Sequence, residues 1–210
     1  MAVIDAVTRK PHGHMELIID GQRFLIYASL YRERPLQPGD EVDLEEFEQW
    51  LLLHQYRPAL EYAVSLLAQR PCATGELKQK LQHAGYRPQT IEMVLYKLSS
   101  NDLVDDAEFA RQWAASRTGR GLGNQRIARE LQRKGVSRED VEAALEEIPE
   151  EEQLEAAEQL ARKALTRAKA GEDPRKVNQR VLAMLARRGY GYDIAKRALR
   201  QAGTALDEEL

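Results

Sequence analysis

Basic side chains are concentrated in two segments of this 210-residue chain, and their spacing favours the binding of anions. Residues 117–138 carry seven Lys or Arg side chains and a single acid, Glu130, and residues 162–200 carry 12 basic and 3 acidic side chains. Guanidinium groups bind phosphate and carboxylate oxygens through paired hydrogen bonds. The two segments therefore predict contact with a polyanion or with the acidic surface of a partner, although such charges also serve simply to solvate helix faces.

Helical periodicity brings several of these cations together. At about 100° per residue, a helix over residues 124–134 places Ile127 and Leu131 on one side, which we expect to be buried. Three arginines then lie on the opposite side, and a later helix carries three more cations within about 40° of one another beside an apolar stripe. The candidate binding residues are Arg126, Arg129 and Arg133 of the first helix, Lys176, Arg180 and Arg187 of the later helix, and Arg117 and Arg120, which precede both.

The side chains that usually carry catalysis are few and scattered. None of the four histidines stands in a metal-binding spacing, and His12 and His14 are expected at the surface of a turn. Cys72 has no helical His partner nearby and is expected to be a buried or inert thiol. The glycines of residues 119–123 predict a flexible connection rather than a phosphate-binding loop, because no strand precedes them and no Gly-Lys-Ser/Thr follows. The sequence therefore predicts neither an enzyme nor a metal or cofactor site.

Three similar segments supply the elements that position these side chains. Residues 77–86, 127–136 and 181–190 each read as a helix that ends in Gly, and a second helix follows within a few residues. This Gly suits the left-handed position after a helix end, and in each copy the last leucine of the second helix stands 10 residues after it. A further helix precedes each pair, over residues 59–69, 106–117 and 153–168. The unit is thus three helices repeated three times, and units this short should stack into an elongated array.

The first 42 residues differ from the rest and read as β-structure. Strand-like runs over residues 15–19 and 22–27 flank Asp20-Gly21, a two-residue turn typical of hairpins, and residues 2–9 are expected to pair as a third strand. After them, Asp43 is expected to cap a helix, and Pro58 to restart the chain. The predicted fold is mainly α, with three tandem three-helix repeats after a small β-hairpin region. The predicted domains are a β-rich region (1–42), a linking helix (43–57), the repeats (58–104, 105–150 and 151–203) and an acidic tail (204–210).

Composition excludes several classes of protein. The net charge is only −3, and hydrophobic residues make up 43% of the chain. A single cysteine excludes an intramolecular disulfide and a Cys-rich zinc module. No apolar stretch approaches the ~18–20 residues that span a bilayer, and no basic start followed by a long apolar run indicates a secretory signal. We therefore expect a soluble, cytoplasmic protein.

Several sequence features of the repeats resemble the RecX regulatory proteins of bacteria. The most specific is Leu-x-Asp-Asp-x-x-Phe-Ala, which stands here at residues 103–110. The others lie at residues 77–85, at 130–135 (Glu-Leu-Gln-Arg-Lys-Gly) and at 185–190 (Leu-Ala-Arg-Arg-Gly-Tyr). The resemblance covers about residues 58–200, and the hairpin-like N-terminus followed by Pro-Gly-Asp resembles the more variable start of the family.

The resemblance implies a modulator without catalytic activity of its own. RecX-like proteins associate with the RecA recombinase, lodge along the groove of its filament on single-stranded DNA, and restrain its ATP hydrolysis, its strand exchange and its co-protease action in the SOS response. The implied partner is the RecA nucleoprotein filament, with weak binding of single- and double-stranded DNA, and we expect a monomer.

Two other classes of protein remain as alternatives. One is a free-standing DNA-binding regulator that places the helix over residues 124–134 in a DNA groove. The other is a hydrolase, for which the sequence offers no set of catalytic groups.

Overall fold

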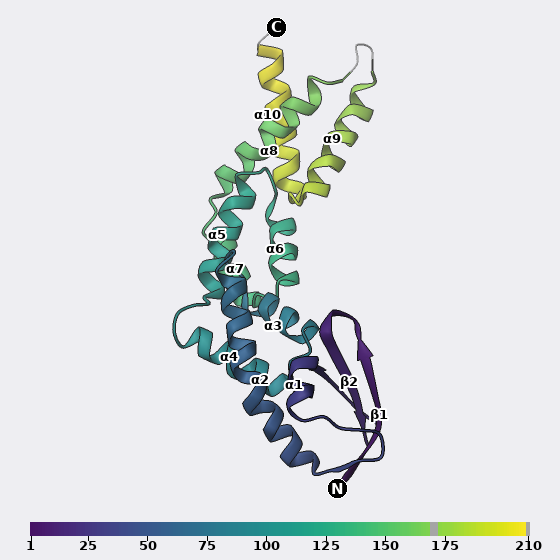
Figure 1. Cartoon of the computed structure of the whole chain (residues 1–210). Helices are drawn as coiled ribbons and strands as arrows, with labels where there is room; N and C mark the ends of the chain where they lie inside the picture. Colours follow the sequence, from purple (N-terminus) through teal and green to yellow (C-terminus); the bar gives the residue numbers. More distant parts are fainter. Residues whose placement is uncertain (169–171, 209–210) are drawn as a thin grey trace. The chain divides into compact units, whose positions relative to one another are not determined.

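Two compact units make up the chain, Met1–Val104 and Asp105–Leu210 (Figure 1). The structure is a computed structural model that describes residues 1–168 and 172–208, except for the side chains of His12 and of residues 205–208. Among the described residues, no helix combines the length and the apolar character needed to cross a membrane.

An antiparallel sheet opens the N-terminal unit, with the strand order β3-β2-β1-β4. Its strands are β1 (Ala2–Lys10), β2 (His14–Ile19), β3 (Gln22–Tyr27) and β4 (Glu41–Val42). Asp20 and Gly21 turn the β2–β3 hairpin with φ angles of 46° and 72°, the left-handed values that a two-residue hairpin turn needs. The predicted hairpin and third strand are confirmed. The short β4 and the helix α1 (Ala28–Glu33) were not predicted.

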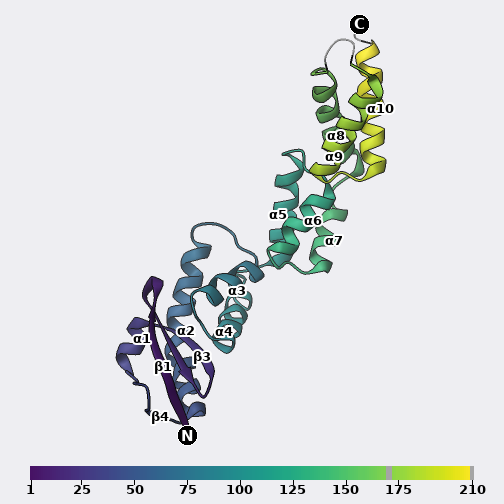
Figure 2. The ribbon, with the colours of Figure 1, turned by 90° about the vertical axis from the view of Figure 1, so that its right-hand side faces the viewer.

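Helix α2 (Leu44–Leu67) connects this sheet to the first repeat, as Figure 2 shows. Its first half buries Phe47 and Leu51 against one face of the sheet, and its second half buries Ala59 and Ala63 in the core of the repeat. The prediction that Pro58 restarts the chain was wrong, because the helix continues through it. Proline costs one helical hydrogen bond, and apolar packing on both sides of Pro58 outweighs that loss.

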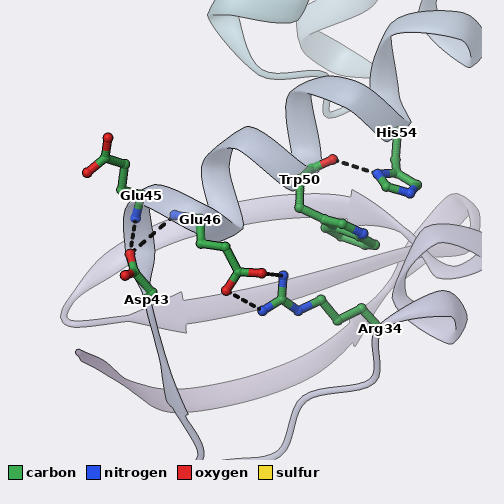
Figure 3. Close-up of polar contacts among 6 residues, drawn as sticks. All are labelled: Arg34, Asp43, Glu45, Glu46, Trp50 and His54. Atoms are coloured by element: carbon green, nitrogen blue, oxygen red, sulfur yellow. Dashed lines mark hydrogen bonds and ion pairs between the residues drawn. The ribbon is translucent and has the colours of Figure 1, made fainter.

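Polar contacts fix the start of α2, and Figure 3 shows them. The Asp43 side chain accepts hydrogen bonds from the backbone N–H groups of Glu45 (3.0 Å) and Glu46 (3.2 Å), which confirms it as the cap. The Arg34 guanidinium donates to both carboxylate oxygens of Glu46, at 3.1 and 3.2 Å, and lies 5.6 Å from the centre of the Trp50 ring. These contacts hold the segment after α1 on the helix.

The first repeat adds α3 (Thr74–His83) and α4 (Pro88–Ser99) to the second half of α2. The buried side chain of Gln55 on α2 caps the start of α4. Its Oε1 accepts a hydrogen bond from the backbone N–H of Arg87 at 3.0 Å and a longer one from the Thr90 hydroxyl at 3.4 Å. Cys72 is buried in the same core, as predicted.

The C-terminal unit contains the second and third repeats. Their helices are α5 (Asp106–Thr118), α6 (Asn124–Arg133), α7 (Arg138–Glu146), α8 (Glu150–Leu165), α9 (Pro174–Arg188) and α10 (Tyr192–Glu208). In each of the three repeats the predicted Gly adopts a left-handed conformation after the middle helix, with φ values of 83°, 79° and 92° at Gly85, Gly135 and Gly189. The mainly α fold of three tandem three-helix repeats is therefore confirmed, whereas the exact domain boundaries stay a prediction.

Candidate anion-binding surface

Helix α6 carries the arginine face predicted from the sequence. Ile127 and Leu131 are fully buried, so the two positions fix which side of the helix meets the core. Arg126, Arg129 and Arg133 are all exposed on the other side. The predicted orientation of this helix is confirmed.

Glu130, the single acid within residues 117–138, contacts two of the candidate cations, Arg117 and Arg126. Its carboxylate accepts hydrogen bonds from Nε of Arg117 at 2.8 Å and from Nε1 of Trp113 at 3.2 Å, and it lies 3.5 Å from Nε of Arg126. The Arg117 guanidinium also lies over the Trp113 ring, 4.0 Å from its centre, while Lys134 Nζ lies 4.3 Å from the same ring. The indole thus holds Arg117 in place, and Glu130 offsets part of the positive charge.

The third repeat supplies the second group of candidate cations, on α9. Val177, Val181 and Leu185 are buried, and Lys176, Arg180 and Arg187 are exposed. Arg180 forms a bidentate pair with Glu172 at 2.5 and 3.2 Å, and this hydrogen bonding raises the pKa of the guanidinium above its ordinary value. The Arg180 side chain is therefore already paired with a carboxylate.

Five of the eight candidate residues form no ion pair or side-chain hydrogen bond with any other residue that the structure describes. We call them the unpaired cations: Arg120, Arg129, Arg133, Lys176 and Arg187. Each is exposed. They are the members of the predicted set that can pair with an external anion without first leaving a partner.

The two groups of cations belong to repeats that contact each other through glycine. The backbone N–H of Gly123 donates to the carbonyl of Arg188 at 3.0 Å, and the N–H of Gln125 donates to the carbonyl of Gly189 at 3.1 Å. A Cβ on Gly123 would approach the Gly189 backbone to less than 3.0 Å, and a Cβ on Gly189 would meet Arg126 in the same way. We call this contact the glycine joint.

The glycine joint gives Gly123 a packing role that the prediction of a flexible connection over residues 119–123 did not include. Besides the two backbone bonds, Nη1 of Arg188 donates to the carbonyl of Gly121 at 3.2 Å. Glycine is needed at Gly123 because two backbones approach each other there, and not to give the chain mobility. The joint brings the start of α6 against the end of α9.

In the described part of the chain, no three His, Cys, Asp or Glu side chains gather as ligands for a metal ion.

The expectation that His14 lies at the surface was wrong: it begins β2, is only 7% exposed and donates a 2.7 Å hydrogen bond from Nε2 to the carbonyl of Ala84. The side chain of His12 lies outside the described residues.

Comparison with known proteins assigns the repeats to one family. Models of the first, second and third three-helix domains of RecX match residues 59–98, 105–145 and 150–199. A "Regulatory protein RecX" of Amycolatopsis mediterranei (strain U-32) is 38% identical over 162 residues, which cover 73% of this chain and 92% of the relative. Another, from Mycobacterium sp. (strain JLS), is 39% identical over 138 residues, 64% of this chain and 75% of the relative.

Solved structures share the fold. The crystal structure of a regulatory protein RecX matches with a TM-score of 0.64 at 23% identity, covering 93% of this chain and 98% of the other. RecX from Lactobacillus salivarius matches with a TM-score of 0.67 at 21% identity, covering 72% and 99%. With three matched domains and these relatives, the chain belongs to the RecX family of regulatory proteins.

Proposed function

We propose that this protein binds the filament that the RecA recombinase forms on single-stranded DNA and modulates, mostly inhibits, its ATP hydrolysis, strand exchange and co-protease activity. The proposal includes no catalytic step. It rests on membership of a regulatory family and on one structural observation, the five unpaired cations on the second and third repeats. A filament of protein on DNA acts on the chromosome, so the proposed site of action is the cytoplasm, and we propose a monomer as the acting form.

Charge complementarity supports this partner. Exposed arginines gain most when they meet phosphate or carboxylate groups that are fixed in an array, because each contact releases bound counterions. The acid-rich residues 139–161, with 10 acidic and no basic side chains, separate the two cationic segments. Such alternation limits indiscriminate binding to any polyanion and favours a partner whose own charges are patterned.

The alternative, a free-standing regulator that inserts α6 into a DNA groove, fits the structure less well. A recognition helix contacts bases mainly with residues of its N-terminal turn. The backbone of the first turn of α6 takes part in the glycine joint, where Gln125 N–H bonds to the Gly189 carbonyl and Arg126 lies against Gly189, while both side chains stay exposed. The end of α9 would therefore have to fit beside the DNA when that turn enters a groove.

Co-sedimentation with RecA filaments, with and without nucleotide, tests the proposal directly. The protein should pellet with RecA-coated single-stranded DNA and bind bare DNA more weakly across a salt titration. Equal affinity for bare duplex, with a preference for particular bases, would favour the alternative and refute the filament proposal.

The arginine face is tested by substitution. Replacing Arg126, Arg129 and Arg133 by Ala should weaken inhibition of RecA about tenfold, since surface charge contacts contribute about 0.5 kcal/mol each, and helicity should stay intact. Arg129→Ala with Arg133→Ala should account for most of the loss, because Arg126 already contacts Glu130. The matched control replaces three paired arginines of the same unit: Arg111, Arg138 and Arg197. Equal loss of inhibition in the control would mean that net charge alone, and not this face, sets the affinity.

A further inference from the structure

A groove of about 840 Å³ lies within the N-terminal unit, where its lining residues come from the strands, from α3 and from Tyr62 of α2. The volume falls in the range of about 300–1,000 Å³ that small-molecule sites occupy. Strand alternation sends Phe24 and Ile26 into the core with α2, so Arg23, Leu25 and Tyr27 of β3 lie on the opposite sheet face, which lines the groove. The strands precede residue 59, where the first matched RecX domain begins.

Aromatic rings form part of the groove lining and are held in place by neighbours. The Tyr27 ring lies 4.5 Å from that of His14 and 5.5 Å from that of Tyr86, and the Tyr86 ring lies 6.5 Å from that of Tyr62. The hydrogen bond from His14 to the Ala84 carbonyl ties this cluster to the end of α3. Tyr27 and Tyr62 are partly exposed and line the groove, so part of each side chain can contact a planar ligand.

Cations line the same groove as these rings. Lys10 and Arg23 share one carboxylate, Glu16: Lys10 Nζ lies 2.6 Å from it, and Arg23 pairs with its other oxygen. The hydrogen bond from Lys10, followed by the pairing with Arg23, keeps the pKa of Glu16 below its ordinary value. Because two positive charges face one negative charge, this corner of the groove keeps a net positive charge.

The α3 side of the groove adds a further positive charge. Lys80 is half-buried and pairs with no other residue in the described part of the chain. His83 donates from Nδ1 to the Gln79 carbonyl at 2.7 Å, which leaves its Nε2 free for a ligand. Glu76, the acid in the lining, is engaged by Arg70. The α3 side therefore presents a lysine without a counter-ion.

Partly exposed tyrosine rings, a lysine without a counter-ion (Lys80) and a cation that shares its carboxylate with Lys10 (Arg23) match the two parts of a nucleotide, its base and its phosphate. We infer that this groove binds a nucleotide, either free or as one unit of a single strand, with the base on Tyr27 and Tyr62 and the phosphate at Lys80 and Arg23. An acidic peptide would use the cations but would leave the rings without a planar partner. The inference does not rest on the proposed function, because the groove lies in a different unit from the unpaired cations.

The test uses the full chain carrying Arg126, Arg129 and Arg133 replaced by Ala, so that the arginine face does not contribute. Binding of labelled oligothymidine is followed by fluorescence anisotropy, and binding of AMP by calorimetry. Tyr62→Ala and Lys80→Ala should each weaken binding about tenfold, as expected for loss of one stacking or one phosphate contact. The matched controls are Tyr96→Ala, an exposed tyrosine of α4, and Lys78→Ala, an exposed lysine of α3, neither of which lines the groove.

Each outcome bears on the inference. Saturable AMP binding that depends on Tyr62 and Lys80 assigns a free nucleotide to the groove, and binding of the oligonucleotide alone with the same dependence assigns a single strand. Absence of binding by both probes overturns the inference, as does equal weakening by the control variants. Tighter binding of a poly-glutamate peptide that depends on Lys80 but not on Tyr62 also overturns it, in favour of an acidic peptide. Because Tyr62 packs on the repeat core, circular dichroism checks its folding, and Lys80→Ala gives a second readout from an α3 position outside that core.

Discussion

Replacing Gly123 by Ala is expected to break the contact between the second and third repeats. The backbone at Gly123 has φ −84° and ψ 160°, values that alanine adopts without strain. The whole effect must therefore come from the added Cβ, which would lie less than 3.0 Å from the Gly189 carbonyl group and the Tyr190 nitrogen. Since these are backbone atoms, a rotamer change cannot relieve the overlap.

The expected loss of stability is about 3 kcal/mol. Separating the backbones weakens two hydrogen bonds, Gly123 N–H to Arg188 and Gln125 N–H to Gly189, worth about 1 kcal/mol each. Residual overpacking adds about 1–3 kcal/mol, and the lower entropy of the unfolded alanine chain returns about 0.5 kcal/mol. At roughly 4 °C per kcal/mol for a unit of this size, the melting temperature should fall by about 12 °C.

Differential scanning calorimetry measures the shift, and hydrogen exchange at the Gln125 amide reports on the joint itself. Gly119→Ala is the matched control. Its φ is −60°, and a Cβ there meets only backbone oxygens at 3.6 and 3.9 Å, so its stability should be unchanged or slightly higher. If Gly123→Ala melts within 2–3 °C (about 0.5 kcal/mol) of the control and keeps Gln125 protected, the close approach is absent and the reasoning fails.

Three further substitutions test other parts of the structure. Tyr190→Phe should stabilise the protein by about 1 kcal/mol in urea denaturation at neutral pH, because the buried hydroxyl has no hydrogen-bond partner among the described residues; a loss of stability would show that it has one. Burial raises the pKa of Tyr190 to about 12 from 10.0, so the folded state favours the neutral phenol over the ionised one. This pH-dependent part of the free energy of unfolding is fully present below pH 10 and is lost as the pH rises toward 12. It should be absent from Tyr190→Phe. Gln55→Ala should lower the free energy of unfolding by about 2 kcal/mol, because it leaves the Arg87 N–H and the Thr90 hydroxyl without their acceptor. The control Gln49→Ala, at an exposed position of the same helix, should change it by almost nothing. Equal losses in the two variants would contradict the capping role of Gln55. Glu16 has a lowered pKa, so its ionised form stabilises the N-terminal unit above about pH 4.5, and this effect is lost as the pH falls through its folded pKa. Glu16→Gln should therefore reduce the fall in the free energy of unfolding at acid pH. An unchanged fall would mean that other groups cause the acid dependence.

The sequence predicts the repeats well because their signals are local. A glycine after a helix end is required wherever the chain turns through a left-handed conformation, and this requirement recurs at Gly85, Gly135 and Gly189. The same holds for the Asp20-Gly21 hairpin turn and for the Asp43 cap, each of which depends on atoms within three residues. Periodicity likewise identified the buried side of α6, since it needs only the spacing of Ile127 and Leu131.

Features decided by distant packing could not be predicted in this way. Pro58 is a local signal for a helix end, but α2 continues because it buries side chains in two cores, one on each side of that residue. His14 stands in a polar stretch of sequence and is nevertheless buried, because the end of α3, 70 residues later, supplies the Ala84 carbonyl as its partner. The glycine joint is of the same kind, since the reason for Gly123 lies in the third repeat.

Which of the candidate cations are already paired with a carboxylate also depends partly on distant packing, so the sequence could not predict it. The Arg126–Glu130 pair follows from a spacing of four on one helix, but Arg117 reaches Glu130 across 13 residues because α5 packs beside α6, and Arg180 pairs with a glutamate that precedes its helix. Charge counts treat all eight cations alike, whereas the structure pairs three of them, Arg117, Arg126 and Arg180, with the carboxylates of Glu130 and Glu172. An anion that binds at Arg117 or Arg180 must first displace a carboxylate, which costs roughly what the new contact returns. For the proposed function we therefore expect the net gain on binding to come from the unpaired cations, and the partner surface to place its acidic groups opposite them.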